Sequence, residues 1–349
     1  MHFYTLDPLF DHRWDDLVAS HPQASAFHTT SWLRALANTF GYQPIVLTST
    51  PPHQRLSDGV VFCEIRSWIT GSRLISLPFS DHAEPLLRDS GPKRELEQWV
   101  QAAHSLHGWK YVELRPMFKQ SEATSPLKVL KVSQSFWFHS LNLSPSIEQL
   151  FASLHKNCIQ RRIRHAEHEH LTYERGASDE LIRAFYNLLI ITRRRFGLLP
   201  QPQTWFRNVL AGMSPNAEIR LARKDDVPIA AIFTLRHRDT VVYKYGCSDH
   251  RFHYLGGMPF LFWKLIEESK SEGAEQIDFG RTDLDNSSLT EFKDRLGTIR
   301  TKINYLRYPT NEKAGLAPLA RMTAARDLCS LLPSPLSSAL GRLVYRHVA

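Results

Sequence analysis

Cysteine is scarce in this 349-residue sequence, and no two cysteines form a C-x-x-C pair. The four are Cys63, Cys158, Cys247 and Cys329. Their wide spacing excludes a disulfide scaffold and a cysteine-zinc cluster. No apolar run approaches the ~18 residues of a membrane-spanning helix. The first residues, MHFYTLDPLFDHRWDD, lack the basic start and apolar core of a secretory signal. We therefore expect a cytoplasmic protein with reduced thiols.

Common catalytic motifs are also missing. The sequence contains no G-x-S-x-G turn, no Walker loop and no Ser/His/Asp order, which argues against hydrolases and nucleotide triphosphatases. The 17 histidines include His165, His168 and His170, but these form no H-x-x-x-H pair with a carboxylate on the same face. We expect no metal and no tightly bound cofactor.

Charge is distributed unevenly along the chain. Residues 1–145 carry 13 basic and 13 acidic side chains, whereas residues 146–349 carry 30 basic and 22 acidic ones. The whole net charge of +8 thus lies in the second half. An arginine-rich half beside a neutral one indicates binding of an anion such as nucleic acid, a pyrophosphate or a nucleotide, although solubility alone would also explain it.

The two halves repeat one order of predicted elements. Apolar spacing predicts, in the first half, a helix at 29–40, strands at 45–49, 59–68 and 73–78, a helix at 95–107 and a strand at 111–115. The second half has a hairpin at 217–223 and 228–236, a strand at 240–247, a helix at 257–271 and a strand at 276–280. Three residue pairs recur at offsets of 165 or 166: Gly108 and Gly273, Glu113 and Asp278, Arg115 and Arg281. Such repetition predicts two copies of one α/β unit.

Helices are predicted between the repeats and in the tail. Ser144 and Pro145 are placed to begin a helix that continues to residue 170, and a second helix follows at 179–196. The tail after Pro309 has an amphipathic segment at 318–332 and ends in GRLVYRHVA. We expect domains at 1–145 and 146–308 and a helical tail at 309–349. This tail could cover the first domain's core or lie on a membrane surface. We expect it to cover the core, with at most weak, salt-sensitive membrane contact.

A glycine pair lies at a predicted strand-to-helix junction. The chain runs from Arg251 to Gly256 and Gly257 and then enters a helix. Backbone N–H groups at such a junction can bind an anion, and an arginine suits a phosphate. The same residues would also make an ordinary tight connection.

Six stretches in order resemble the Fem-type aminoacyl and peptidyl transferases, which carry two GNAT domains in tandem. They are FHTTSWLRAL (27–36), RLISLPFSDH (73–82), TRRRFGLLPQP (192–202), YKYGCSD (243–249), IDFGRTD (277–283) and SLTEFKDRLG (288–297). The chain looks most similar to bacterial FemAB-related proteins of exopolysaccharide systems, including the BioF2-like acetyltransferase type. It departs from the standard acetyl-CoA loop, since four residues rather than two separate Arg251 from Gly256.

The resemblance implies an α/β (α+β) fold of two tandem GNAT-like domains with mixed sheets, and an acyl or aminoacyl transferase. The acceptor would be an amine of a small-molecule or lipid-linked glycan precursor of the cell envelope. The donor would be aminoacyl-tRNA or acyl-CoA. Lys293 would stabilise the oxyanion and Asp81 would take the proton. We expect a monomer, cytoplasmic or peripheral at the inner membrane face.

Further site residues follow from position. Arg281 and Asp283 lie past a strand end, where α/β ligands bind, and join Arg251, Gly256 and Gly257 on the donor side. The acceptor side comprises Arg73, His82, Arg115 and Lys244. Two of these acceptor-side residues, and Asp81, also have structural alternatives. Arg115 would pair with Glu113, Lys244 would pair with Asp278, and Asp81 would serve only its own turn. Basic helices at 156–164 and 193–195 make tRNA a possible partner, which leaves open a non-catalytic pair that binds RNA or a pyrophosphate.

Overall fold

The computed structural model describes residues 3–87, 93–117, 128–309 and 334–347. These residues divide into two compact units, the first comprising 3–136, 302–309 and 343–347, and the second 137–301 and 334–342. The bounds differ from the expected 1–145 and 146–308. The expected helix at 318–332 lies outside the described residues, whereas the C-terminal one is α11, Ser334–Val344.

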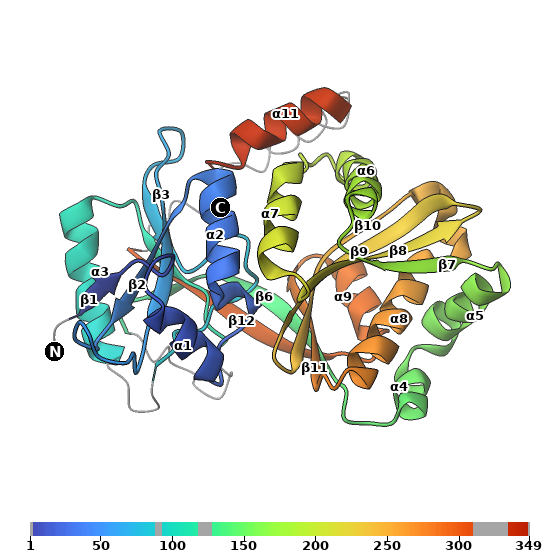
Figure 1. Ribbon diagram of the computed structural model, residues 1–349, viewed down its shortest axis with the longest axis horizontal. Helices are drawn as coiled ribbons and strands as arrows, with labels where there is room; N and C mark the ends of the chain where they lie inside the picture. The colour runs from blue at the N-terminus through green and yellow to red at the C-terminus, as the bar shows by residue number, and fades with distance from the viewer. Residues whose placement is uncertain (1–2, 88–92, 118–127, 310–333, 348–349) are drawn as a thin grey trace. The chain divides into compact units, whose positions relative to one another are not determined.

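The first unit is a mixed sheet with helices on both faces. Its elements are β1 Tyr4–Leu6, α1 Arg13–Ser20, η1 Ala26–His28, α2 Thr30–Phe40, β2 Gln43–Thr48, β3 Val60–Ile65, β4 Arg73–Ile75, α3 Lys93–His107 and β5 Val112–Leu114. Figure 1 shows α3 on one side of these strands and α1 and α2 on the other. Leu96 and Val100 of α3 pack on Phe62 and Leu74, which form part of one core cluster.

The second unit has the same layered plan with more helices. It contains α4 Ile147–Ser153, η2 Lys156–Gln160, α5 Arg161–His168, β7 Thr172–Gly176, α6 Asp179–Arg195, α7 Gln203–Met213, β8 Ala217–Lys224, β9 Val227–His237, β10 Thr240–Ser248, η3 His250–Leu255, α8 Gly257–Ser271, β11 Gln276–Asp283 and α9 Ser287–Asp294. In Figure 1, α6 and α7 cover one face of β8–β10 and α8 the other.

Strand pairing confirms the predicted repeat. In the first unit β2, β3 and β4 are antiparallel neighbours, and β4 then pairs with β5 in parallel. In the second unit β8, β9 and β10 are antiparallel neighbours, and β10 pairs with β11 in parallel. A helix lies between the two parallel strands each time, α3 and α8. Gly108 and Gly273, which follow these helices, both have positive φ (64° and 76°).

Two long strands explain the shifted boundaries. β6 (Lys131–Asn142) follows the first repeat in sequence, yet it is the neighbour of β11 in the strand order. β12 (Ile299–Tyr308) follows the second repeat, yet it pairs with β5 through Leu306↔Leu114. The strand that follows the first repeat therefore lies next to β11 of the second repeat, and the strand that follows the second repeat pairs with β5 of the first. The predicted boundary was placed between the two sequence repeats, and repeat spacing carries no information about this exchange of strands.

The helical segment between the repeats is interrupted, contrary to the single helix expected from Ser144 to residue 170. Ser146, not Ser144, is the N-cap of α4, and its hydroxyl accepts a hydrogen bond from the Gln149 N–H. The helix stops before His155, whose ring accepts a hydrogen bond from the Cys158 N–H and so begins η2. β7 follows α5 as the antiparallel partner of β8.

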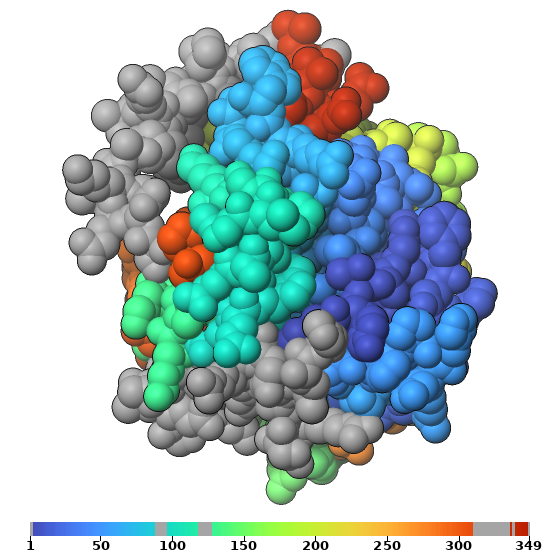
Figure 2. Space-filling view, turned by 90° about the vertical axis from the view of Figure 1, so that its left-hand side faces the viewer, coloured from blue at the N-terminus to red at the C-terminus, as the bar shows by residue number. Residues whose placement is uncertain are grey.

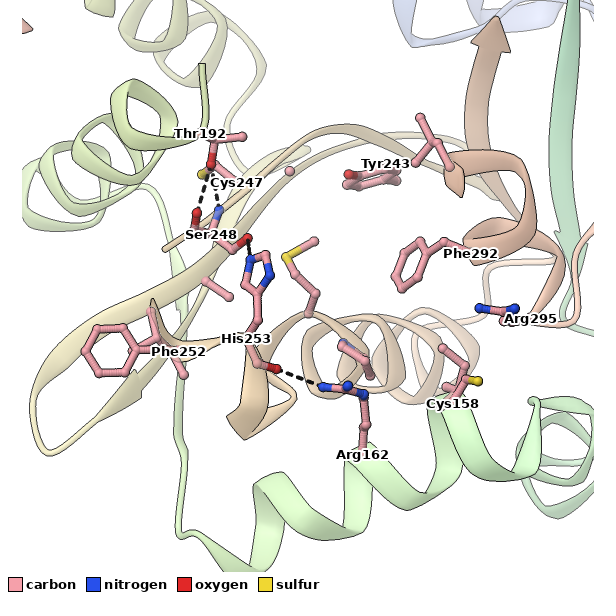
Figure 3. A pocket seen from close by; sticks show the side chains of 18 of the residues that line it. Cys158, Arg162, Thr192, Tyr243, Cys247, Ser248, Phe252, His253, Phe292 and Arg295 are labelled. Atoms are coloured by element: carbon pink, nitrogen blue, oxygen red, sulfur yellow. Dashed lines mark hydrogen bonds between the residues drawn. The ribbon is translucent and has the colours of Figure 1, made fainter. Parts of the chain in front are cut away.

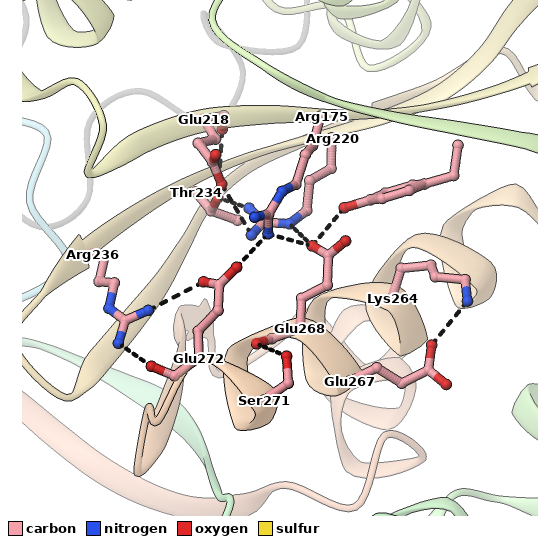
Figure 4. Close-up of polar contacts among 11 residues, drawn as sticks. Arg175, Glu218, Arg220, Thr234, Arg236, Lys264, Glu267, Glu268, Ser271 and Glu272 are labelled. Carbon is pink, nitrogen blue, oxygen red and sulfur yellow. Dashed lines mark hydrogen bonds and ion pairs between the residues drawn. The ribbon is translucent and has the colours of Figure 1, made fainter.

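An ion-pair network connects α8 to the strands of the second unit (Figure 4). Arg220 on β8 is 3% exposed, and it contacts Glu218, Glu268 and the Thr234 hydroxyl. Arg175 on β7 pairs with Glu268 and Glu272. The cations come from strands, whereas Glu268 belongs to α8 and Glu272 is the C-cap residue that follows it. The network therefore fixes the C-terminal end of α8 against the sheet.

Candidate functional site

The ladder between β10 and β11 ends early. Its pairs are Thr240↔Gln276, Val241↔Ile277 and Val242↔Asp278, although both strands continue for several residues. From Tyr243 onwards the two strands diverge. A gap between parallel strands exposes backbone groups that would otherwise pair with each other, so this is a place where a ligand can bind.

A bulge in β10 occurs at the same point. Tyr243 pairs with Thr234 and Tyr245 pairs with Phe233, so Lys244 is the extra residue. The bulge turns the two tyrosines to opposite faces although they are two residues apart. Tyr243 packs on Phe262 and Phe279 beside α8 and β11, whereas the Tyr245 hydroxyl accepts a hydrogen bond from Trp205 Nε1 on α7.

A cavity of about 480 Å³ lies on the Tyr243 side (Figure 3). Its walls come from β9, β10, η3, the start of α8, α9, the end of α6 and the η2–α5 segment. The lining residues used below are Cys158, Arg162, Thr192, Arg195, Tyr243, Gly246, Ser248, His253, Gly257, Phe292 and Arg295. At position 246 a Cβ atom would collide with the Tyr243 hydroxyl, so glycine is needed for this ring to lie along β10.

Arginine dominates the charge of the cavity. Arg162 Nη1 donates to the His253 carbonyl oxygen at 2.9 Å, and Arg195 lies over the Phe196 ring at 4.7 Å. Arg295 pairs with Glu291 at 3.0 Å. Three guanidinium groups, of which Arg295 has an acidic partner, make the cavity suitable for an anionic ligand.

A hydroxyl and an imidazole meet inside the cavity. Ser248 Oγ is 2.9 Å from His253 Nε2. Thr192 Oγ1 on α6 accepts from the Ser248 N–H at 2.9 Å and donates to the Ser248 carbonyl oxygen at 3.0 Å. Burial, and then the charges of Arg195, His250 and Arg162, lower the pKa of His253 despite the opposing effect of Asp249. The imidazole is therefore neutral at neutral pH.

The predicted glycine turn lies at the cavity, but close packing against neighbouring residues explains why glycine is needed at these two positions. Gly256 has φ +78° and is the N-cap of α8. A Cβ atom there would lie 2.6 Å from the Arg162 carbonyl oxygen of α5. Gly257 lines the cavity, and its Cβ would lie 3.1 Å from the Cβ of Ala230. The first turn of α8 thus reaches the cavity while α5 covers Gly256.

Lys293, the predicted oxyanion group, is 2% exposed and is not among the residues that line the cavity. Its Nζ donates to the carbonyl oxygens of Gly280 and Arg281 at 3.2 and 3.1 Å. Asp278 Oδ1 in turn accepts from the Gly280 N–H at 2.6 Å. Lys293 therefore fixes the diverging end of β11, a role that sequence spacing did not indicate.

The other predicted donor-side residues are spread around this end of the unit. Arg251 forms a bidentate pair with Asp249, and its side chain is 71% exposed. Arg281 is half-buried and Asp283 exposed at the end of β11. Lys244, which was predicted on the acceptor side, occupies the bulge of β10 with its Nζ 5.5 Å from the centre of the Tyr245 ring. Of the predicted donor-side residues, Gly257 is the one that lines the cavity.

Asp81 and His82 belong to the first unit, after β4. The Asp81 carbonyl oxygen accepts a hydrogen bond from the Tyr305 hydroxyl at 2.8 Å. The His82 ring packs edge-on against Phe27, with 5.3 Å between ring centres. Both side chains are half-buried.

The two predicted acceptor arginines are buried and bound to protein. Arg115 Nε donates to Glu113 at 2.9 Å, Nη1 donates to the Leu77 carbonyl oxygen at 2.8 Å, and the group lies over the Tyr305 ring. Arg73 Nη2 donates to the His347 carbonyl oxygen at 2.8 Å. Arg115 thus makes the ion pair that the sequence suggested as its structural alternative, and Arg73 holds the end of the chain.

The first unit has its own cavity of about 710 Å³, beside α3 and the N-terminal segment. Trp99, Trp109 and Ile45 line it, and Glu64 Oε1 accepts from Trp109 Nε1 at 3.1 Å. The teal atoms of α3 and the dark blue atoms of the N-terminal segment are exposed on this face of the first unit in Figure 2. No motif in the sequence pointed to this cavity.

Sequence inspection also missed the residues that define the second unit's cavity. Thr192, Ser248, His253 and Phe292 are separated in sequence and gather through the packing of α6, β10, η3 and α9. The available signal was local: Ser248 and Asp249 lie three and two residues before the predicted Arg251. Among the described residues, no group of three His, Cys, Asp or Glu side chains could hold a metal ion. No helix in that part of the chain is long and apolar enough to cross a bilayer.

Solved structures share this architecture across nearly the whole chain. The crystal structure of FemX matches with a TM-score of 0.67 at 15% identity, covering 90% of this chain and 98% of FemX. L-PGS from Bacillus licheniformis matches with a TM-score of 0.58 at 11% identity, covering 92% and 96%. A tandem GNAT protein from the clavulanic acid biosynthesis pathway matches with a TM-score of 0.55 at 12% identity, covering 89% and 99%. These likenesses establish the fold.

None of the curated protein sequences matches this chain significantly. A family model does match: that of the acetyltransferase (GNAT) domain, over residues 153–294. The matched range runs from the last residue of α4 to the end of α9, so it includes every residue that lines the second unit's cavity except Arg295. The mixed α/β fold, its similarity to tandem GNAT proteins and the match of residues 153–294 to a GNAT acetyltransferase domain agree with one another.

Proposed function

We propose that this protein is an acyltransferase that moves an acyl or aminoacyl group from a donor held in the second unit to an amine of a cell-envelope or exopolysaccharide precursor. One observation carries the proposal: the β10–β11 ladder ends at Val242 and Asp278, and a cavity of about 480 Å³ begins beside it. A donor lying there can approach the backbone of β10 and the first turn of α8, whose N–H groups suit a developing oxyanion.

The charges of the cavity indicate what kind of donor would bind. Arg162, Arg195 and Arg295 reach the cavity from three different elements. Both aminoacyl-tRNA and acyl-CoA carry phosphates that guanidinium groups bind well. The fold shared with FemX and with L-PGS supports transfer of an amino acid, and the GNAT domain match supports transfer of a simple acyl group.

Aminoacyl-tRNA is the donor we favour, because α5 covers the Gly256 turn. The Arg162 backbone occupies the space beside Gly256, where a pyrophosphate would need open N–H groups. The unusual spacing between Arg251 and Gly256 agrees with this. Acyl-CoA is the second candidate, supported by the family match to an acetyltransferase domain.

Two predicted catalytic residues take specific parts in the proposal. Lys293 acts as a positioning residue, since its Nζ holds two carbonyl groups where β11 leaves β10. Asp81 is the proposed proton acceptor for an amine that attacks the donor directly, and its side chain is half-buried after β4 in the first unit. A lipid-linked acceptor would bring the protein to a membrane surface.

The donor can be identified by binding. Thermal-shift and fluorescence titrations would compare acetyl-CoA with charged and uncharged tRNA, for the full chain and for a double variant, Arg162→Ala with Arg195→Ala. Loss of two phosphate contacts should weaken binding of the true donor at least tenfold. Arg183→Ala, an exposed change on the same helix as Arg195, is the matched control.

The same samples test the activity. Transfer of a radiolabelled acyl or aminoacyl group to an amine acceptor supports the proposal. Tight tRNA binding without transfer to any amine tested would instead support a non-catalytic RNA-binding pair. Failure of both donors to bind would contradict the proposal.

A further inference from the structure

The loop between β3 and β4 presents two large apolar side chains to solvent. Trp68 is 89% exposed and Ile69 is 59% exposed. The loop extends beyond the ends of its strands in Figure 1, and the Gly71 N–H donates to the Ser67 carbonyl oxygen, so these two residues lie within a tight turn. A tryptophan and an isoleucine at a projecting tip indicate a surface that meets an apolar partner.

A row of exposed apolar side chains also lies on α11. Leu336, Leu340 and Leu343 are exposed, and their spacing of four and three residues places them on one face of the helix, here called the leucine face. Gly341 is buried, and a Cβ atom there would collide with the Pro200 carbonyl oxygen. The helix therefore packs through a different side, and the leucine face is directed away from that contact.

The end of the chain joins the loop to α11. The His347 ring contacts Trp68 edge-on, with 5.8 Å between ring centres, and His347 Nδ1 lies 3.0 Å from the Ser67 hydroxyl oxygen. The Thr70 hydroxyl donates to the His347 carbonyl oxygen at 2.9 Å. Leu343 lies four residues before His347, which is about one helical turn. The C-terminal end of the leucine face therefore adjoins the loop tip.

The charge around this surface is positive. Residues 334–349 include Arg342 and Arg346 but no aspartate or glutamate, and both arginines are exposed. Lys110 is also exposed, and its Nζ lies 3.5 Å from the Thr70 carbonyl oxygen of the loop. Exposed apolar side chains among cations fit the surface of a bilayer whose lipids carry negative charge.

We propose that the Trp68–Ile69 tip and the leucine face together form a docking surface for a bilayer that contains anionic lipids. Tryptophan is enriched at the headgroup level of membranes, and the leucines of an amphipathic helix enter the boundary of the acyl chains. Arg342, Arg346 and Lys110 then lie near the lipid phosphates. The sequence predicted at most weak contact from the tail alone, and the loop adds an apolar anchor that the tail lacks.

Charge favours a lipid surface over a second protein as the occupant. Three exposed cations suit a dense layer of phosphates. Glu64 near the loop pairs with Arg66 at 2.9 Å, so its charge opposes this attraction little. None of the docking residues lines the second unit's cavity, so the inference does not depend on the proposed function.

Vesicle sedimentation tests the docking surface without any donor or acceptor. The full chain should bind vesicles of about one third phosphatidylglycerol and two thirds phosphatidylcholine, and added salt should weaken binding by screening the cations. The double variant Trp68→Ser with Ile69→Ser should bind at least tenfold more weakly. Phe10→Ser, which removes an apolar side chain that is 81% exposed elsewhere in the first unit, is the matched control and should bind normally.

A second double variant tests the helix separately. Leu340→Gln with Leu343→Gln should also weaken vesicle binding, and Arg342→Glu with Arg346→Glu should abolish the preference for phosphatidylglycerol. All these side chains are exposed, so melting temperatures should stay close to that of the natural chain.

The outcomes separate this inference from the proposed function. Vesicle binding by a chain that transfers no acyl group would retain the docking surface and reject the proposed function. Absence of binding to the anionic vesicles, or equal binding by the natural chain and the loop double variant, would overturn the inference. Self-association in sedimentation equilibrium that the same substitutions abolish, without vesicle binding, would overturn it in favour of an interface between two copies of the chain.

Discussion

Glu113 on β5 and Asp278 on β11 occupy the same place in the two units: each is 2% exposed, and each ends a short parallel ladder, opposite Ile75 and Val242. Their partners differ. Glu113 bonds to Arg115 and Arg307, whereas Asp278 accepts the N–H of Gly280 in its own strand. One repeated position has therefore been used for an ion-pair cluster in the first unit and for shaping a strand end beside a cavity in the second.

Glu113→Gln should destabilise the first unit strongly. Burial opposes ionisation of Glu113, but Arg115 and Arg307 outweigh it and hold the carboxyl pKa below its ordinary value. Removing the charge leaves Arg115 buried without its counter-ion, which costs about 3 kcal/mol or more. Urea unfolding measures this. Glu180→Gln, which breaks the exposed pair with Arg223, should change stability by less than about 1 kcal/mol; equal effects would contradict the assignment.

Alanine substitutions at two glycines with nearly the same φ can distinguish the cost of backbone strain from the cost of steric collision. Gly256 and Gly273 have φ of +78° and +76°, but a Cβ at Gly273 would meet nothing within 4 Å whereas one at Gly256 would meet the Arg162 carbonyl oxygen. Gly273→Ala should therefore cost only the conformational strain of about 1–2 kcal/mol. Gly256→Ala should cost more and displace α5 from the turn. Equal losses on thermal unfolding would show that α5 does not cover Gly256.

His139 should make stability fall in mildly acidic solution. Burial, followed by the charges of Lys293 and Arg300 against that of Asp294, lowers its pKa from 6.5 to about 4. Between about pH 6.5 and 4 the unfolded chain binds a proton at His139 that the folded chain does not, so stability falls as the pH falls, by up to about 3 kcal/mol. His139→Gln should flatten this slope in denaturant unfolding at several pH values. His165→Gln, an exposed change, should retain it.

Cys158 should report binding in the cavity. It is half-buried and lines the cavity, whereas burial raises the pKa of the Cys63 and Cys247 thiols and keeps them unreactive. In a Cys329→Ser background, iodoacetamide should modify Cys158 first, and Cys158→Ser should remove this reaction. The true donor should protect the thiol. If a saturating concentration of donor leaves the alkylation rate of Cys158 unchanged, the donor does not bind in this cavity.

Removing residues 343–349 should destabilise the first unit. The Arg73 guanidinium and the Tyr42 hydroxyl would lose the carbonyl oxygens of His347 and Tyr345 as acceptors. Two unsatisfied buried donors cost about 3 kcal/mol together. Removing only residues 348–349 keeps both contacts and is the control. Identical melting temperatures for the two truncated chains would show that this contact contributes little.

Patterns that act over a few residues were predictable. The helix expected at 257–271 is α8 with the same bounds, because a glycine turn precedes it and its apolar spacing is regular. The repeat offset placed Gly108 and Gly273 after equivalent helices, and the spacing of Glu113 and Arg115 suggested their ion pair. The interruption before His155 was missed, since a side-chain hydrogen bond rather than a helix-breaking residue marks it.

The sequence by itself therefore determined the repeated α/β order, the basic second half and the kind of fold, because these depend on periodicity, turn residues and composition. Tertiary structure decided where β6 and β12 pair, that Lys293 is buried, and that Ser248 meets His253 beside arginines from two helices. The reason is physical. Strand exchange and cavity formation depend on contacts between residues distant in sequence, and local preferences carry no information about which of those contacts will form.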